Sequence, residues 1–145
     1  MASELTEAAR AFLRDARVGR LATADAEAWP HAVPVCFVLL DDACYIPLDE
    51  KPKRTDVRRL KRVRNLAENP RAALVVDRWD EDWSRLAWVL VRGNATVLEP
   101  GAEQARAVAA LRDKYPQYRA MWLDDAPVIR LHAERVRAWG DLRWD

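Results

Sequence analysis

The chain has 145 residues, of which 50% are hydrophobic and 32% are charged. This length suits one domain over residues 1–145, and this composition predicts a packed globule rather than a disordered chain. No apolar run approaches the roughly 20 residues of a membrane-spanning helix, so no membrane association is expected. The amino-terminal sequence is acidic and lacks the apolar core of a signal peptide, which favours a cytoplasmic location.

The sequence excludes several common catalytic and cofactor sites. Its four glycines are dispersed, whereas dinucleotide-binding turns and Walker A loops need clustered glycine. Two cysteines and two histidines are too few for a zinc site of the CxxC type. No nucleophile, metal site or acid–base constellation stands out, so we name no catalytic residue and no metal ligand. Any redox chemistry would then belong to a bound cofactor.

The first part of the chain predicts one helix and several strands. Apolar residues at helical spacing follow a capping residue, Ser3, and the helix ends before Gly19, which opens a short strand. The segment 30–39 is nearly all apolar and predicts a strand buried on both faces. The pair Asp41-Asp42 predicts a tight turn into a further strand, 43–47, and thus a hairpin.

A helical stripe follows, formed by Val57, Leu60, Val63 and Ala67, and Asn69-Pro70 ends it. The next strands are expected over 72–77 and 86–99, and a glycine within the second of them, Gly93, predicts a bend such as a barrel corner.

A helix is expected over 102–114, with Ala105, Val108, Ala109 and Leu111 facing inward, and the last strands lie within 126–139. About six strands with short links predict an α+β protein that is mainly β, an antiparallel barrel with helices packed outside.

Positive charge is concentrated in residues 51–71, which hold nine Lys or Arg and two Asp or Glu, while the rest of the chain is net acidic. Lys51, Lys53 and Arg54 precede a helix whose first N–H groups also attract anions, so this segment predicts a phosphate cradle. The alternative is a solvated basic loop. Nucleic-acid binding is disfavoured because no helix-turn-helix pattern follows and the segment has no aromatic residue.

Seven tryptophans are too many for the core of so small a domain. Some of them are expected to line a cleft for a planar ligand or an interface between subunits. For any single tryptophan, partly buried packing is the alternative.

Several segments together resemble the pyridoxamine 5′-phosphate oxidase-like split β-barrel superfamily. Within it, they are similar to the actinobacterial class of probable coenzyme F420-dependent oxidoreductases. The resemblance covers about residues 5–139 and is carried by GRLAT (19–23), WPHAVPVCFVL (29–39), YIPLDEKPKR (45–54), RRLKRVRNLAENPRAALVVDRWDEDWSRL (58–86), WVLVRGNATVLEPG (88–101) and YPQYRAM (115–121).

The resemblance implies a six-stranded antiparallel split β-barrel, a homodimer, and a flavin or deazaflavin in the groove between subunits. It implies that the tricyclic ring rests on the strand at Val33, Pro34 and Val35. It places the phosphate at Pro47, Leu48, Lys51, Lys53 and Arg54. The basic helix that follows is expected to bind the rest of an anionic tail, at Arg58 first and then at Arg62. Residues that close the site, from either subunit, would be Trp79, Trp83, Trp88 and Arg92.

One departure from the family pattern favours F420 over FMN. FMN-binding relatives carry basic residues at two strand positions that hold Val33 and Val38 here, whereas the basic run from Lys51 suits the longer anionic tail of F420. The expected activity is hydride transfer between reduced F420 and a small organic acceptor that the sequence does not identify. The alternatives are an FMN-binding oxidase or reductase and a protein that binds or stores F420 without catalysis.

Overall fold

The computed structural model describes residues 5–48 and 57–144. In these ranges the chain forms three α-helices, eight β-strands and three short 3-10 helices. The α-helices are α1 (Glu7–Asp15), α2 (Lys61–Glu68) and α3 (Ala102–Lys114). The strands are β1 (Gly19–Ala24), β2 (Pro30–Val35), β3 (Val38–Leu40), β4 (Ala43–Pro47), β5 (Arg71–Arg78), β6 (Ala87–Leu98), β7 (Val128–His132) and β8 (Arg135–Gly140). The 3-10 helices are η1 (Val57–Arg59), η2 (Trp83–Arg85) and η3 (Pro116–Ala120).

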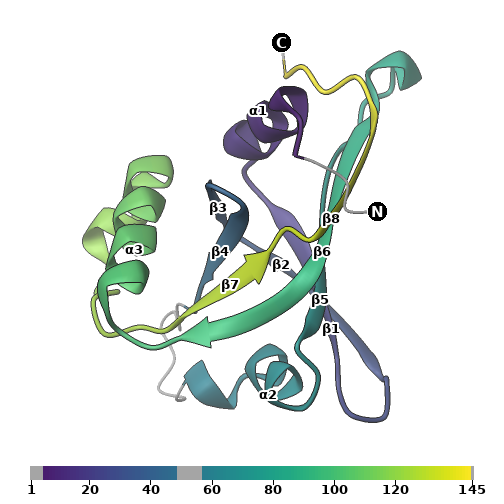
Figure 1. The fold of residues 1–145 in the computed structure, drawn as a ribbon. Coiled ribbons are helices and arrows are strands. Elements are labelled where there is room, and N and C mark those ends of the chain that lie inside the picture. Colours follow the sequence, from purple (N-terminus) through teal and green to yellow (C-terminus); the bar gives the residue numbers. More distant parts are fainter. Residues whose placement is uncertain (1–4, 49–56, 145) are drawn as a thin grey trace.

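All eight strands belong to one strongly curved antiparallel sheet (Figure 1). The strand order is β2-β1-β5-β6-β7-β4-β3, and β8 pairs with β6 beside β7. The expected class, mainly β with flanking helices, is confirmed, but the described chain has eight strands rather than six. The strands at the two ends of this order, β2 and β3, do not pair with each other within the described residues, so the sheet is open there.

The expected strand over 30–39 is two strands, and the expectation of burial on both faces was wrong for the first of them. β2 ends at Val35 and β3 begins at Val38. Along β2 the side chains alternate between exposed and more buried, because one face of this edge strand covers the core and the other faces outward. Proline is tolerated on such an edge strand, which explains Pro30 and Pro34.

β6 is strongly bent and joins the two halves of the sheet (Figure 1), and its change of partner, between Arg92 and Ala95, brackets Gly93. Its first half pairs with β8 and its second half with β7, while β5 follows its other edge from Ala87 to Asn94. A Cβ atom on Gly93 would lie 2.0 Å from the carbonyl oxygen of His132, so the close approach of the backbones at this corner requires glycine. The bend predicted at this residue is confirmed.

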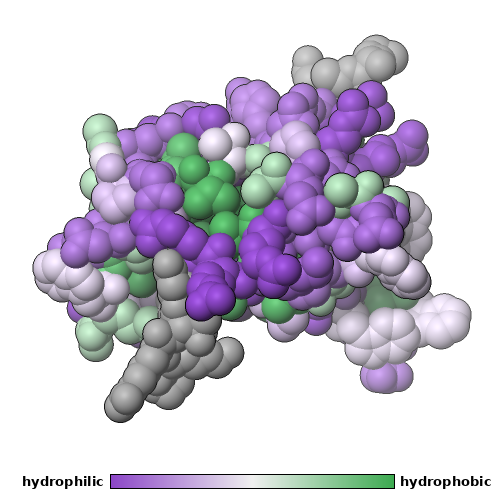
Figure 2. Space-filling view, turned by 90° about the horizontal axis from the view of Figure 1, so that it is seen from below, coloured by the Kyte–Doolittle hydropathy of each residue, from purple (hydrophilic) through white to green (hydrophobic). Residues whose placement is uncertain are grey.

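The helices lie outside the sheet and cover two clusters of buried residues. α1 packs on the larger cluster through Phe12 and Leu13, and its cap is Thr6, whose side chain accepts a hydrogen bond from the Ala9 amide at 3.1 Å. α3 lies beyond β3 from α1 and buries Val108 and Leu111 in the second cluster (Figure 1). From below, hydrophilic side chains cover most of the surface, and apolar ones are visible in a depression among them (Figure 2).

Two helix predictions need correction. Leu60 has an extended backbone, so the helix expected from Val57 is a short 3-10 turn followed by α2 from Lys61. In α3 the bounds are as predicted, but Gln104 and Ala107 face inward and Ala105 and Ala109 are exposed. The Gln104 amide donates hydrogen bonds to the carbonyl oxygens of Leu123, Asp124 and Ala126 at 2.8–3.1 Å, which stabilises a buried polar side chain.

Candidate functional site

A hollow of about 250 Å³ brings together three of the residues expected to hold the cofactor. Pro34 and Val35 come from the end of β2, and Pro47 comes from the end of β4. The remaining lining residues are Val18, Cys36, Arg62 and Tyr118. The hollow therefore has apolar walls and one guanidinium group, a combination that fits a planar ring with an anionic substituent.

This hollow forms where strands end. The sheet pairing of β2 stops at the partners Val35 and Gly19, and β4 stops at Pro47, which pairs with Val128. Arg62 comes from the first turn of α2. The sequence analysis expected Arg62 only as a contact of the anionic tail beyond Arg58, because helical spacing alone does not tell which cation faces β2 and β4.

The other apolar residues of the predicted site face the interior. Val33 pairs with Leu21 and packs against the larger core cluster, and Val38 is buried in the second cluster. Leu48 is 1% exposed, and its amide donates a hydrogen bond to the carbonyl oxygen of Pro127 at 3.3 Å. Any contact between a ligand and these positions would therefore involve the backbone more than the side chains.

The predicted phosphate-binding cations lie mostly outside the described residues: this applies to Lys51, Lys53 and Arg54. Arg58 is described and exposed, and its guanidinium pairs with the Glu99 carboxylate, with Nε 3.2 Å from Oε2. An anionic ligand at Arg58 would have to compete with this carboxylate.

The residues expected to close the site lie elsewhere in the same chain. Trp79 and Trp83 are 63% and 70% exposed on the connection between β5 and β6. Trp88 stands on β6 opposite Asp77 and Trp139. Arg92 is also on β6, and strands β1 and β5 separate it from β2. Within one chain, these four residues do not line the hollow at Pro34.

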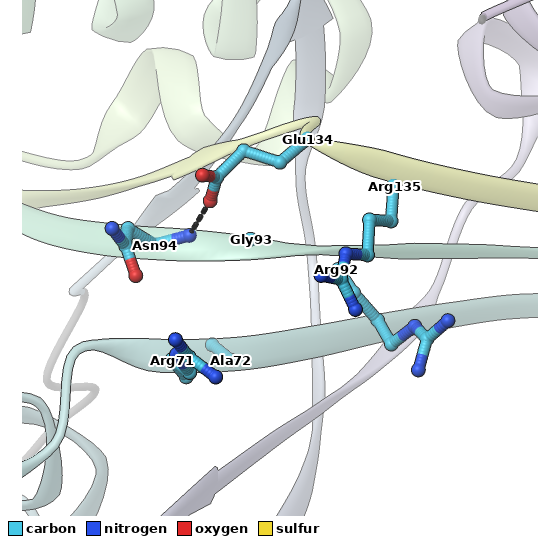
Figure 3. Close-up of a pocket in the computed structure, with 7 residues that line it drawn as sticks. All are labelled: Arg71, Ala72, Arg92, Gly93, Asn94, Glu134 and Arg135. Atoms are coloured by element: carbon cyan, nitrogen blue, oxygen red, sulfur yellow. Dashed lines mark hydrogen bonds between the residues drawn. The ribbon is translucent and has the colours of Figure 1, made fainter. Parts of the chain in front are cut away.

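The structure reveals a second hollow that the sequence analysis missed, also of about 250 Å³ (Figure 3). It lies at the bend of β6 and contains Arg92 together with Arg71 of β5 and Arg135 of β8. Asn94 and Glu134 complete its polar lining. These residues come from three strands and from the connection between β7 and β8, and no motif in the sequence marks them as neighbours.

Burial suppresses the reactivity of the two groups that most resemble nucleophiles. Burial raises the pKa of the Cys44 thiol to about 12 and that of Tyr115 to about 12. Cys44 is thus an inert residue of the core. Cys36 is half-buried and lines the hollow at Pro34.

Residues 5–48 and 57–144 contain no helix that is long and apolar enough to span a membrane.

Comparison with known proteins agrees with this geometry. The family model for pyridoxamine 5′-phosphate oxidase matches residues 5–140. A curated relative, 5a,11a-dehydrotetracycline/5a,11a-dehydrooxytetracycline reductase of Streptomyces rimosus, is 32% identical over 130 residues, which cover 89% of this chain and 78% of the relative.

Two solved structures have closely similar folds. A conserved hypothetical protein from Mycobacterium tuberculosis has a TM-score of 0.76 and 22% identity, over 97% of this chain and 87% of the other. A heme binding protein from Mycobacterium smegmatis has a TM-score of 0.76 and 29% identity, over 97% of this chain but 55% of the other. The chain belongs to the pyridoxamine 5′-phosphate oxidase family.

Proposed function

We propose that this protein is an F420-dependent reductase that transfers a hydride between the reduced deazaflavin and a small organic acceptor. The observation that carries the proposal is the hollow in which Pro34, Val35 and Pro47 meet the Arg62 guanidinium. The similarity to a reductase from Streptomyces rimosus supports reduction as the reaction class.

In this proposal the residues of the chain bind and orient the cofactor. Pro34, Val35 and Pro47 form the apolar wall against the ring, and Arg62 with the basic segment that includes Lys51, Lys53 and Arg54 holds the anionic tail. When bound, the deazaflavin supplies a hydride donor, so no side chain of the hollow needs to act as a nucleophile. Apolar walls also exclude water from the ring face, which strengthens the electrostatic interactions at the site.

F420 is favoured over FMN because of Val33 and Val38. Both side chains face the interior, and neither carries a charge for the phosphate of FMN. Two missing charge-assisted hydrogen bonds correspond to about 3–6 kcal/mol of binding free energy.

We also propose that two copies of the chain assemble with the cofactor between them. Small side chains, Ala22, Ala32 and Ala73, stand in one cross-strand row on the outward face of the sheet, and Trp139 on the same sheet is 51% exposed. A flat surface of this kind suits close packing of a second sheet. The partner would then bring Trp79, Trp83, Trp88 and Arg92 to the hollow at Pro34.

Titration of the purified protein with F420, FMN and heme, followed by tryptophan fluorescence, tests the cofactor. The expected result is F420 binding in the micromolar range or tighter, with FMN at least about tenfold weaker. FMN binding as tight as that of F420 would replace this proposal with an FMN-dependent oxidase or reductase.

The mass of the protein in solution tests the assembly. At micromolar concentration it should be that of a dimer, whose interface is expected to exceed about 1,000 Å². The mass of a monomer would contradict the proposed assembly.

A binding protein without catalysis is the second candidate, and the similarity to a heme binding protein at 29% identity favours it. Binding of F420 without turnover of any acceptor, or binding of heme in preference to F420, would support this candidate over the reductase.

A further inference from the structure

Three arginines meet at the corner of the sheet without a protein counter-ion. Among the residues that the structure describes, no side-chain hydrogen bond or ion pair involves the guanidinium of Arg71, Arg92 or Arg135. Other arginines of the molecule do have carboxylate partners: Arg20 pairs with Asp77 at 2.7 Å and Arg130 with Glu103 at 3.0 Å. Within the described ranges, other exposed arginines such as Arg14 and Arg137 also lack a carboxylate partner, so the three at the corner are distinguished by lining one hollow.

The sheet register forces two of these charges together. Arg92 on β6 and Arg135 on β8 are direct cross-strand partners, so their side chains leave the same face of the sheet. Like charges in this position destabilise a pair of strands. Arg71 approaches from β5, whose partner on β6 is Asn94. All three residues line one hollow, and in Figure 3 Arg71 lies on one side of it and Arg135 and Arg92 on the other, with the Arg92 guanidinium extending away from Arg71.

The nearby carboxylate does not neutralise them. Glu134 accepts a hydrogen bond from the backbone amide of Asn94, and Figure 3 shows its carboxylate turned toward that amide. No ion pair joins Glu134 to an arginine within the described ranges. The residues that line the hollow thus carry three guanidinium groups and one carboxylate group, and the Asn94 carboxamide adds a further hydrogen-bond donor.

We propose that this corner pocket, formed by Arg71, Arg92, Asn94, Glu134 and Arg135, binds a compact polyvalent oxyanion. Guanidinium groups donate paired hydrogen bonds to phosphate and carboxylate oxygens, which matches the planar donor geometry of arginine. The lining, which is mostly charged and polar, suits a phosphate or a di- or tricarboxylate rather than an apolar ring. Within one chain the pocket is distinct from the hollow at Pro34, because β1 lies between β2, which carries Pro34, and β5, which carries Arg71. In the assembly proposed above Arg92 would serve both sites, so the variants below test Arg135 instead.

Isothermal titration with pyrophosphate, citrate and γ-linked triglutamate at constant ionic strength tests the proposal, with acetate as the monovalent comparison. Saturable binding of a polyvalent anion, with one site per chain, is the expected result. Tighter binding of pyrophosphate or citrate would identify a small free anion as the ligand, and tighter binding of triglutamate would identify an anionic chain.

Two matched variants locate the site. Arg135→Gln should weaken the binding at least about tenfold, which corresponds to about 1.4 kcal/mol. Arg137→Gln removes an exposed arginine from the same strand, two residues away and outside the pocket lining, and should change affinity less than about twofold. Equal losses in both variants, or no binding beyond that of acetate, would overturn the proposal. The proposal would also be wrong if the parent protein bound no anion and Arg135→Gln changed the oligomeric mass in solution, because Arg135 would then serve the contact between subunits.

Discussion

The ammonium group of Lys114 lies 4.1 Å from the centroid of the Phe37 ring and donates a 3.0 Å hydrogen bond to the Phe37 carbonyl oxygen. A second hydrogen bond reaches the carbonyl oxygen of Leu13 at 3.3 Å. Lys114 thus connects the end of α3 to α1 and to the break between β2 and β3. Burial lowers the pKa of this amine from 10.5 to about 8.

Stability should consequently depend on pH through Lys114. Because the folded state releases this proton at lower pH than the unfolded state, Lys114 makes the folded state relatively more stable as the pH rises from about 8 toward 10.5. In this window the free energy of unfolding of the wild type should rise, relative to that of Lys114→Met, by up to about 1.4 kcal/mol per pH unit. Urea unfolding of both proteins between pH 7 and 10 measures the difference.

Comparison with a variant is needed because other groups act in the opposite direction. The raised pKa values of Cys44 and Tyr115 destabilise the folded state at alkaline pH in both proteins, so most of their effect cancels in the difference. The part that remains comes from the charge of Lys114, which lowers the pKa of Cys44 against the larger effect of burial. Lys61→Met, which changes an exposed lysine, is the matched control. A pH dependence that is the same for the wild type and Lys114→Met would contradict the prediction.

Arg78 is expected to hold the carboxyl-terminal segment against α1. Its guanidinium donates hydrogen bonds to the carbonyl oxygens of Arg85, Asp141 and Arg143, and it lies 5.3 Å from the ring centroid of Trp144, which stacks on Phe12 at 4.7 Å. Arg78→Met should lower the free energy of unfolding by about 2–4 kcal/mol, because several carbonyl groups lose a charged donor.

Chemical denaturation together with limited proteolysis measures this effect. Cleavage near residues 141–144 should become faster in Arg78→Met. Arg14→Met removes an exposed arginine of α1 and should change stability by less than about 0.5 kcal/mol. If the two variants were equally stable, Arg78 would not anchor the segment.

Gly93→Ala should be strongly destabilising. The added Cβ atom would lie 2.0 Å from the His132 carbonyl oxygen, and backbone on both sides of the corner prevents relaxation. A loss of more than about 3 kcal/mol is expected, above the usual range for overpacking. Gly101→Ser is the comparison: it stands at the N-cap of α3, where the nearest atom is 3.8 Å from an added Cβ, and it should be neutral or slightly stabilising. Thermal unfolding of both variants measures the difference, and equal midpoints would refute this account of the corner.

Cofactor binding should depend on the cations at the hollow and in the basic segment. Arg62→Gln and Lys53→Ala should each weaken F420 binding about tenfold or more, since each removes a charge-assisted contact to the anionic tail. Higher salt should weaken binding and a longer glutamate tail should strengthen it. Arg64→Gln, an exposed position on the same helix outside the hollow, is the control. Fluorescence titration provides the measurement. Unchanged affinity in both test variants would favour the alternative interpretation, in which the basic segment is a solvated loop that binds no cofactor.

Local signals in the sequence were sufficient for most individual elements. The bounds of α3, the hairpin at Asp41-Asp42 and the bend at Gly93 all follow from helical spacing, turn residues and an isolated glycine. These features depend on residues a few positions apart, so their physical cause lies within the segment itself. The family resemblance added the expectation that Pro34 and Pro47 belong to one site, and the structure places both at one hollow.

Other features were decided only by tertiary structure. The break at residues 36–37 that divides an apolar run into β2 and β3 depends on which strands the two halves pair with. The burial of Gln104 depends on carbonyl groups about 20 residues further along the chain. The arginines of the corner pocket become neighbours because three strands share one register, and a change of register by one residue would send each side chain to the opposite face of the sheet. Pairing between distant strands determines that register, and no short segment of the sequence contains it.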